Sequence, residues 1–244
     1  MAMSVTEEAE RVHAHSRKSR DAARRERRRA RERTIIAATR TLFDERGMRD
    51  APIDEIARAT KLNKALIYRA FDSKEEIFVV TVTDYLAELE ERAAALKPRK
   101  DPAVALREAL ELYVAFCRDY PAFLDCALSL MHQPAAELRE RVSGAVWFRL
   151  GRAMAGSLGR LERILADGAA AGVFAIDDTD FVANRMYTQV LGSMHLARAG
   201  VGVREVAPGV AEAFELPQDR ICDACLEDAL LLARITPPKK AKTR

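Results

Sequence analysis

The sequence predicts an all-α protein, and three observations support this prediction. Apolar residues recur at intervals of three and four along most of the chain, as on the buried side of an α-helix. Residues that favour helix starts and ends, such as Pro, Asp, Asn and Gly, divide this pattern into segments of helical length. No segment shows the apolar–polar alternation that is typical of a half-buried β-strand.

Two short helices with a tight break between them are expected near residue 60. The first contains Ile53 and Ile56 at helical spacing and follows Pro52, which suits a first helical position. The break is too short for a loop, and Asn63 can cap a second helix over residues 64–70. Two helices joined by such a turn form a helix-turn-helix, whose second helix enters the major groove of DNA.

The second helix is expected to be amphipathic. Its inward side consists of Leu66, Ile67 and Phe71. Its outward side consists of Lys64, Ala65, Tyr68 and Arg69. A capping box of Ser73 and Glu76 then predicts the start of another helix.

Residues 34–78 keep a specific order and spacing of apolar, polar and turn residues. The series is Ile35-Ile36, Leu42-Phe43, Gly47, Ile53 to Ala57, Leu62-Asn63-Lys64, Tyr68, Phe71 and Ser73-Lys74-Glu75. It resembles the N-terminal domain of the TetR family of transcriptional regulators. The resemblance implies an N-terminal three-helix helix-turn-helix DNA-binding domain at residues 24–78, and a C-terminal helical ligand-binding and dimerisation domain at residues 79–235.

The resemblance also implies which residues contact double-stranded DNA. Arg69 is the best candidate for a guanine edge, whereas Lys64, Tyr68 and Lys74 would mostly bind phosphates. The expected DNA-binding residues are Arg33, Thr34, Lys61, Asn63, Lys64, Ala65, Tyr68, Arg69 and Lys74. A two-fold homodimer would favour a near-palindromic operator.

Four departures from the usual family pattern occur, one of which is Thr39 in place of a usual Ala in the first helix. Ala51-Pro52 stands where Thr or Ser usually caps the second helix and can touch a phosphate. Lys61 stands where Gly is usual, and a left-handed backbone there would cost about 1 kcal/mol, although a Lys could also reach a phosphate. Ala65 replaces a common Gly, which should stiffen the recognition helix.

Positive charge is concentrated at the two ends of the chain. Residues 17–33 hold ten Lys or Arg and three acidic residues, whereas the whole chain has a net charge of only +3. We expect residues 1–23 to form a basic arm without regular structure and residues 236–244 to form a basic tail. Either the arm adds phosphate contacts, or it is a solvated charge run.

Beyond residue 78 the sequence predicts one helix after another. The expected ranges are 73–96, 102–119, 121–131, 134–171 with a break near 143–144, 179–199 and 217–235, with a longer connection over 200–216. Candidates for a pocket that would take an apolar small molecule are Tyr113, Phe116, Phe123, Met131, His132, Trp147, Phe148, Met154, Phe174, Tyr187 and Met194. Most of these residues would equally suit an ordinary core.

The last two expected helices are apolar around most of their circumference, which predicts burial on several sides. A homodimer with a four-helix interface would provide this burial, and the alternative is a monomer with a large core. Candidate interface residues are Val182, Met186, Val190, Ser193, Ala197, Cys222, Cys225, Leu226 and Leu230. The Cys222-x-x-Cys225 pair is more typical of buried thiols than of a metal site, and a redox sensor remains an alternative.

These features predict a cytoplasmic, dimeric repressor that a small, largely apolar ligand releases from its operator, without a metal or another cofactor. One alternative is a ligand-independent DNA-binding regulator controlled by a protein partner or by thiol oxidation. A helical enzyme is a more remote alternative, because the His and acidic residues lack the spacing of a catalytic or metal site. The chain has no apolar run of membrane-spanning length and no apolar core of a signal peptide.

Overall fold

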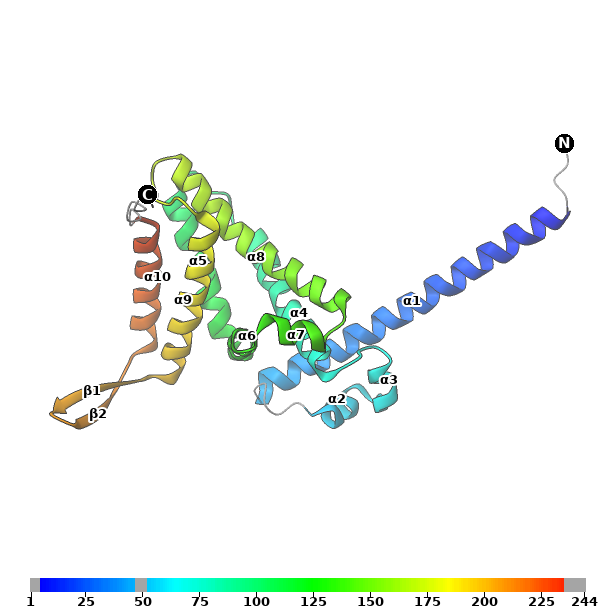
Figure 1. Ribbon diagram of the computed structural model, residues 1–244, viewed down its shortest axis with the longest axis horizontal. Helices are drawn as coiled ribbons and strands as arrows, with labels where there is room; N and C mark the ends of the chain where they lie inside the picture. Colours follow the sequence, from blue (N-terminus) through cyan, green and yellow to red (C-terminus); the bar gives the residue numbers. More distant parts are fainter. Residues whose placement is uncertain (1–4, 47–51, 235–244) are drawn as a thin grey trace, which may run out of the picture. The chain divides into compact units, whose positions relative to one another are not determined.

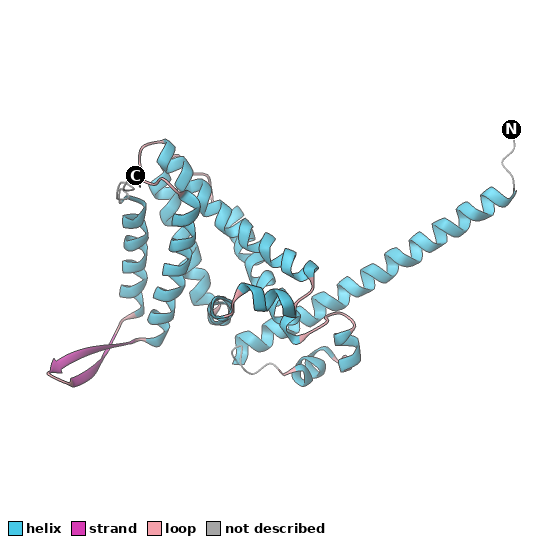
Figure 2. Ribbon diagram, viewed as in Figure 1, coloured by secondary structure: helices cyan, strands magenta, loops and turns pink. Residues whose placement is uncertain are grey.

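The computed structural model describes residues 5–46 and 52–234, and the chain divides into two compact units at residue 81 (Figure 1). Helices dominate both units (Figure 2), so the all-α prediction is confirmed apart from one small sheet. Several features expected from the sequence lie outside the described residues: the first four residues of the arm, Gly47, Ala51 and the basic tail at 236–244.

The N-terminal unit is built from α1 (Val5–Arg46), α2 (Ile53–Thr60), α3 (Lys64–Tyr68) and the first part of α4 (Lys74–Ala94). The three-helix arrangement has a common core of apolar side chains. This core includes Ile35, Ile36, Leu42, Phe43, Ile56, Ile67, Phe71 and Ile77, all of which are buried. The rings of Phe43 and Phe78 also meet, with their centroids 6.4 Å apart.

Helix α1 is longer than expected, because residues 5–23 continue the helix instead of forming an arm without regular structure. The sequence up to Arg46 contains no Gly or Pro, so nothing in the chain interrupts a helix once it has formed. Residues 19–30 are all exposed. This part of α1 is therefore helical through local propensity, without support from a packed face.

The C-terminal unit contains the second part of α4 and six further helices. These are α5 (Pro102–Asp119), α6 (Pro121–His132), α7 (Ala135–Arg141), α8 (Gly144–Ala170), α9 (Thr179–Ala199) and α10 (Gln218–Arg234). The expected break near residue 143 is confirmed, since Ser143 separates α7 from α8. Helix α9 packs against α8 and α10, and α8 also packs against α5.

A β-hairpin joins α9 to α10, which corrects the expectation that residues 200–216 contain no strand. β1 (Val201–Ala207) pairs antiparallel with β2 (Val210–Glu215), and Gly209 occupies the turn with a φ of 76°. The sequence did not reveal the strands because neither face is buried: Val203 is 72% exposed. A strand with two exposed faces lacks the alternation by which half-buried strands are recognised.

A network of polar side chains fixes α4 within the C-terminal unit. The Arg92 guanidinium donates to the Glu88 carboxylate at 2.7 Å, to Asp119 at 2.8 Å and to the Tyr120 hydroxyl at 3.0 Å. The Tyr120 hydroxyl donates in turn to Glu88 at 2.7 Å. These bonds connect α4 to the end of α5 and the start of α6, so a shift of α4 within this unit would break several of them together.

Candidate DNA-binding surface and ligand cavity

The turn between α2 and α3 depends on a left-handed residue at Lys61. Its φ and ψ are 55° and 27°, and it is the only described non-Gly residue with a positive φ. The Lys61 backbone N–H donates to the Arg58 carbonyl at 3.2 Å, and the Leu62 N–H donates to the Ala57 carbonyl at 3.1 Å. This pair of bonds is the Schellman arrangement that ends many helices. The backbone at Lys61 is therefore left-handed, which is the condition under which the cost considered for this position applies.

Helix α3 begins as expected, at a side-chain cap. The Asn63 side chain accepts a hydrogen bond from the Leu66 backbone N–H at 2.9 Å. Ile67 and Phe71 are 0% and 2% exposed, which anchors α3 to the core of the N-terminal unit. The regular helix ends at Tyr68 rather than Ala70, although the Phe71 N–H still donates to the Ile67 carbonyl at 3.1 Å.

All nine residues expected to contact DNA are exposed. Four of them lie on one side of α3 and its C-terminal cap and form what we call the α3 surface: Lys64, Ala65, Tyr68 and Arg69. Within residues 5–46 and 52–234, the side chains of Tyr68 and Arg69 have no hydrogen bond or ion pair. An exposed guanidinium and an exposed phenol without internal partners are available to bases and phosphates.

Two of the basic residues expected to contact DNA form ion pairs inside the protein. The Lys64 ammonium forms an ion pair with Asp54 of α2 at 2.6 Å, and Arg33 pairs with Glu26 at 3.0 Å. Both pairs are exposed, so they contribute little to stability. The carboxylate of Asp54 nevertheless competes with any phosphate for Lys64. This role of Asp54 was not predicted from the sequence, because an acidic residue in a first helical turn is already explained by the helix dipole.

The start of α4 completes this part of the N-terminal unit. The Ser73 hydroxyl accepts from the Glu76 backbone N–H at 3.1 Å, as expected for a capping box. The Glu76 carboxylate accepts from the backbone N–H of Asp72 at 2.9 Å and is only 3% exposed. Lys74, in the first turn of α4, is exposed.

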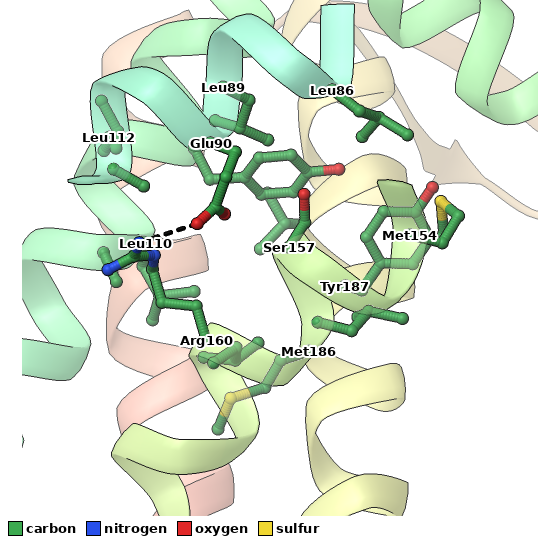
Figure 3. Close-up of a pocket in the computed structure, with 16 residues that line it drawn as sticks. Leu86, Leu89, Glu90, Leu110, Leu112, Met154, Ser157, Arg160, Met186 and Tyr187 are labelled. Atoms are coloured by element: carbon green, nitrogen blue, oxygen red, sulfur yellow. Dashed lines mark hydrogen bonds and ion pairs between the residues drawn. The ribbon is translucent and has the colours of Figure 1, made fainter. Parts of the chain in front are cut away.

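The C-terminal unit contains a cavity of about 80 Å³ between α4, α5, α8 and α9 (Figure 3). Leu86 and Leu89 of α4 face Met154 of α8 and Met186 of α9 across it. The wall of the cavity is therefore mostly aliphatic, and Tyr187 of α9 contributes an aromatic ring to it. Such walls accommodate apolar molecules, because the ligand exchanges water for hydrocarbon contacts.

A few polar groups interrupt this wall. The Arg160 guanidinium donates to the Glu90 carboxylate at 2.7 Å, and Figure 3 shows this pair at one side of the cavity. The Tyr113 and Ser157 hydroxyl oxygens and the Arg160 Nε are buried and have no hydrogen-bond partner in the described structure. Burial raises the pKa of Tyr113 well above its ordinary value and raises that of Tyr187 to about 12, so both phenols are neutral at pH 7.

Comparisons with known proteins agree with the geometry of the N-terminal unit. Residues 35–80 match the family described as bacterial regulatory proteins, tetR family. A stretch of 150 residues is 32% identical to the HTH-type transcriptional repressor NicS of Pseudomonas putida KT2440. That stretch covers 59% of this chain and 65% of NicS, which is slightly less than two thirds of the relative. The family match therefore concerns residues 35–80, the helix-turn-helix part of the chain.

Solved structures show that the TetR fold extends over most of the chain. RolR in complex with resorcinol is 19% identical, with a TM-score of 0.58, and the match covers 87% of this chain and 98% of RolR. A TetR transcription regulator from Haloarcula marismortui is 18% identical, with a TM-score of 0.60 and coverage of 84% and 96%. At these identities the likeness concerns the fold alone.

The cavity contains only part of the pocket expected from the sequence. Tyr113, Met154 and Tyr187 line it, whereas Phe116, Phe123 and Met194 are buried in the surrounding core. The other five expected pocket residues, none of which lines the cavity, are Met131, His132, Trp147, Phe148 and Phe174.

Local contacts explain where several of these residues lie. Phe174 packs so closely on Gly168 that a Cβ there would lie 2.0 Å from its ring. Met131 and Phe148 are 47% and 67% exposed. The exposed His132 ring contacts the Leu128 carbonyl at 2.7 Å through Nδ1.

The polar part of the wall and the α4 side of the cavity were not predicted from the sequence. Glu90, Ser157 and Arg160 are residue types that usually lie on a solvated helix face, so their spacing gave no signal. Leu86 and Leu89 lie in the helix expected over residues 73–96, which crosses the boundary between the two expected domains. That crossing was the available signal, because the second part of this helix must pack inside the C-terminal unit.

Most candidate dimer residues turn out to be buried within one chain. Six of them are at most 8% exposed in the single chain: Met186, Val190, Ala197, Cys222, Cys225 and Leu226. Met186 and Val190 line the cavity. The outer surface of the two helices instead carries Phe181 and Leu231, which are 59% and 57% exposed. These two residues line a groove with Asn184, Arg185, Thr188, Gln189, Asp228 and Leu232, and we call this the α9–α10 groove.

All four cysteines are buried and free. Burial raises the pKa of Cys117, Cys222 and Cys225, which disfavours the reactive thiolate. No cluster of three or more potential metal ligands occurs among the described residues. The described helices also include none that is both long and apolar enough to cross a membrane.

Proposed function

We propose that this protein is a sequence-specific DNA-binding transcriptional repressor of the TetR type, active as a homodimer and released from DNA by a small molecule. The main support for this proposal is the α3 surface. It presents Lys64, Tyr68 and Arg69 outward on a helix that is anchored by Ile67 and Phe71.

The exposed side chains of the N-terminal unit suggest separate roles in DNA binding. Arg69 reads a guanine through its N7 and O6, because a guanidinium can donate two hydrogen bonds to that edge. Tyr68, Lys64 and Lys74 bind phosphates and set the position of α3 in the groove. Lys61 adds a phosphate contact at the turn that precedes α3. The exposed basic part of α1 strengthens binding at low salt, because each neutralised phosphate releases a counterion.

The α9–α10 groove is the proposed dimer interface. Phe181 and Leu231 offer exposed apolar side chains, and Arg185 and Asp228 offer opposite charges that a two-fold axis can pair across the interface. Gln189 lines the same groove and has a buried side-chain oxygen without a hydrogen-bond partner. A partner subunit would both cover the apolar residues and supply a donor to this oxygen.

Helix α4 is the proposed link between ligand and DNA. Its first residues, from Lys74 on, belong to the N-terminal unit, and Leu86, Leu89 and Glu90 line the cavity of the C-terminal unit. A ligand changes DNA affinity only if it binds two arrangements of the protein unequally. The cavity is small, so an occupant that requires more room favours an arrangement in which α4 has moved.

Fluorescence anisotropy with a labelled duplex tests the DNA-binding role. The duplex is one that the wild-type protein has selected from a random library. We expect Arg69→Ala to weaken binding about 5- to 150-fold, since a good base contact is worth about 1–3 kcal/mol. Tyr68→Ala should weaken binding as well, through the loss of a phosphate contact. Arg107→Ala is the matched control, because Arg107 is an exposed Arg of the C-terminal unit paired only with Glu111. Unchanged binding by both α3 variants would overturn the assignment.

A further inference from the structure

We propose that the cavity between α4, α5, α8 and α9 binds an uncharged molecule with a single six-membered ring and one hydroxyl or carbonyl group. This inference rests on the proposed effector-binding function and adds the chemical class of the ligand. Three features of the cavity support it: its volume, the polar atoms in its wall that lack hydrogen-bond partners, and the balance of charge in that wall.

The volume of the cavity limits the ligand to one ring. An apolar cavity of roughly 150 Å³ holds benzene, and this cavity measures about 80 Å³. A single ring therefore fits once the wall has expanded to about twice the present volume, whereas a fused ring system or a long acyl chain would require rebuilding of the core. The flexible side chains of Met154 and Met186 in the wall can provide such an expansion.

Three buried polar atoms without hydrogen-bond partners indicate that the ligand carries a polar group. The described residues contain four buried side-chain polar atoms without a hydrogen-bond partner, and three of them belong to residues of this cavity: Tyr113, Ser157 and Arg160. Buried polar groups are nearly always paired, so three such atoms around one cavity indicate a missing partner. The two hydroxyls can donate or accept and the Arg160 Nε–H donates, so a ligand hydroxyl or carbonyl oxygen satisfies them.

The charge balance of the wall favours a neutral ligand. The Glu90 carboxylate lies 2.7 Å from Arg160 and already neutralises the guanidinium. A carboxylate ligand would bring a second negative charge into an aliphatic cavity, where an unpaired charge is strongly disfavoured. Burial also keeps Tyr113 protonated, so its hydroxyl remains a donor that a neutral oxygen can accept.

Titration calorimetry of the full-length protein with four probes tests this ligand class. Toluene and phenol have the same shape but differ in one hydroxyl, and benzamide and benzoate have the same shape but differ in charge. We expect phenol to bind at least tenfold more tightly than toluene, and benzamide at least tenfold more tightly than benzoate. Equal binding of toluene and phenol, tighter binding of benzoate than of benzamide, or binding of none of the four would overturn the proposal.

Two variants connect these preferences to the named residues. In Tyr113→Phe/Ser157→Ala, the affinity for phenol should fall to that for toluene, while toluene binding changes less than threefold and shows that the cavity is intact. In Glu90→Gln, Arg160 loses its counter-charge, so benzoate should become the preferred member of its pair. If both variants keep the wild-type order of affinities, these residues do not select the ligand.

A parallel DNA-binding measurement separates this inference from the proposed function. If phenol binds as expected but leaves DNA affinity unchanged, the ligand class stands and the effector role fails. If benzoate or toluene is preferred and still releases DNA, the effector role stands and the ligand class is wrong.

Discussion

Replacing Lys61 by Gly should stabilise the protein, because Lys61 is held at a φ of 55°. The left-handed conformation costs a residue with a side chain roughly 1–2 kcal/mol, and Gly adopts it without that cost. Gly also gives the unfolded chain more freedom, which removes about 0.4–1 kcal/mol of the gain. The expected net effect is about 0.5–1 kcal/mol, which corresponds to an increase in Tm of roughly 1–4 °C for a protein of this size.

Thermal and urea unfolding followed by circular dichroism measure this effect, and Lys61→Ala is the control. Ala removes the charge but retains a Cβ, so it should show no such stabilisation. Both variants should lose a phosphate contact and lower the salt dependence of DNA binding by about one unit of slope. If Lys61→Gly is no more stable than Lys61→Ala, the backbone at the turn is not strained and the reasoning fails.

Three further predictions follow from contacts in the two units. Asp54→Asn should strengthen DNA binding several-fold in an anisotropy titration at low salt, because it frees Lys64 from its 2.6 Å ion pair. Unchanged DNA affinity would mean that Lys64 does not bind a phosphate. Gly168→Ala should lower the free energy of unfolding by about 1–3 kcal/mol, because the added Cβ would meet the Phe174 ring. Gly151→Ala in the same helix has open space around it and should be neutral or stabilising. Equal effects of the two substitutions in urea denaturation would contradict this packing. The free energy of unfolding should decline as the pH rises above about 9, because burial raises the pKa of Cys117, Tyr113 and Tyr187 and the unfolded chain therefore releases these protons first. Tyr113→Phe should make this decline shallower. An unchanged slope of the unfolding midpoint against pH in this variant would argue against a buried phenol.

The sequence was sufficient for the N-terminal unit because its signals are local. The Asn63 cap, the Ser73 capping box and the inward positions of Ile67 and Phe71 each depend on residues within a few positions of one another. The possible strain at Lys61 came from the resemblance alone, because Gly usually occupies this position, and the structure places Lys61 in the left-handed region. The Asp54–Lys64 pair was missed because it joins two helices whose relative orientation is a tertiary property.

The lining of the cavity was only partly predictable, because it depends on contacts between residues that lie far apart in the sequence. Tyr113, Met154 and Tyr187 belong to the expected set, but whether an apolar residue faces a void or packed neighbours depends on how four helices meet. Met194 and Phe116 have the same residue character and lie in solid core. The same limit applies to α9 and α10, where residues such as Cys225 and Val190 are covered by their own chain and Phe181 is left on the surface.

Selection of DNA duplexes from a random library, with the wild-type protein and with Arg69→Ala in parallel, tests the central claim most directly. The wild type should enrich an inverted repeat whose half-sites are centred about 10 base pairs, or a multiple of that, apart, because a two-fold dimer presents two α3 helices to successive major grooves. Arg69→Ala should lose the preference for guanine at one position in each half-site and retain the others. An unenriched library, a single unpaired half-site, or the same motif from both proteins would contradict the account.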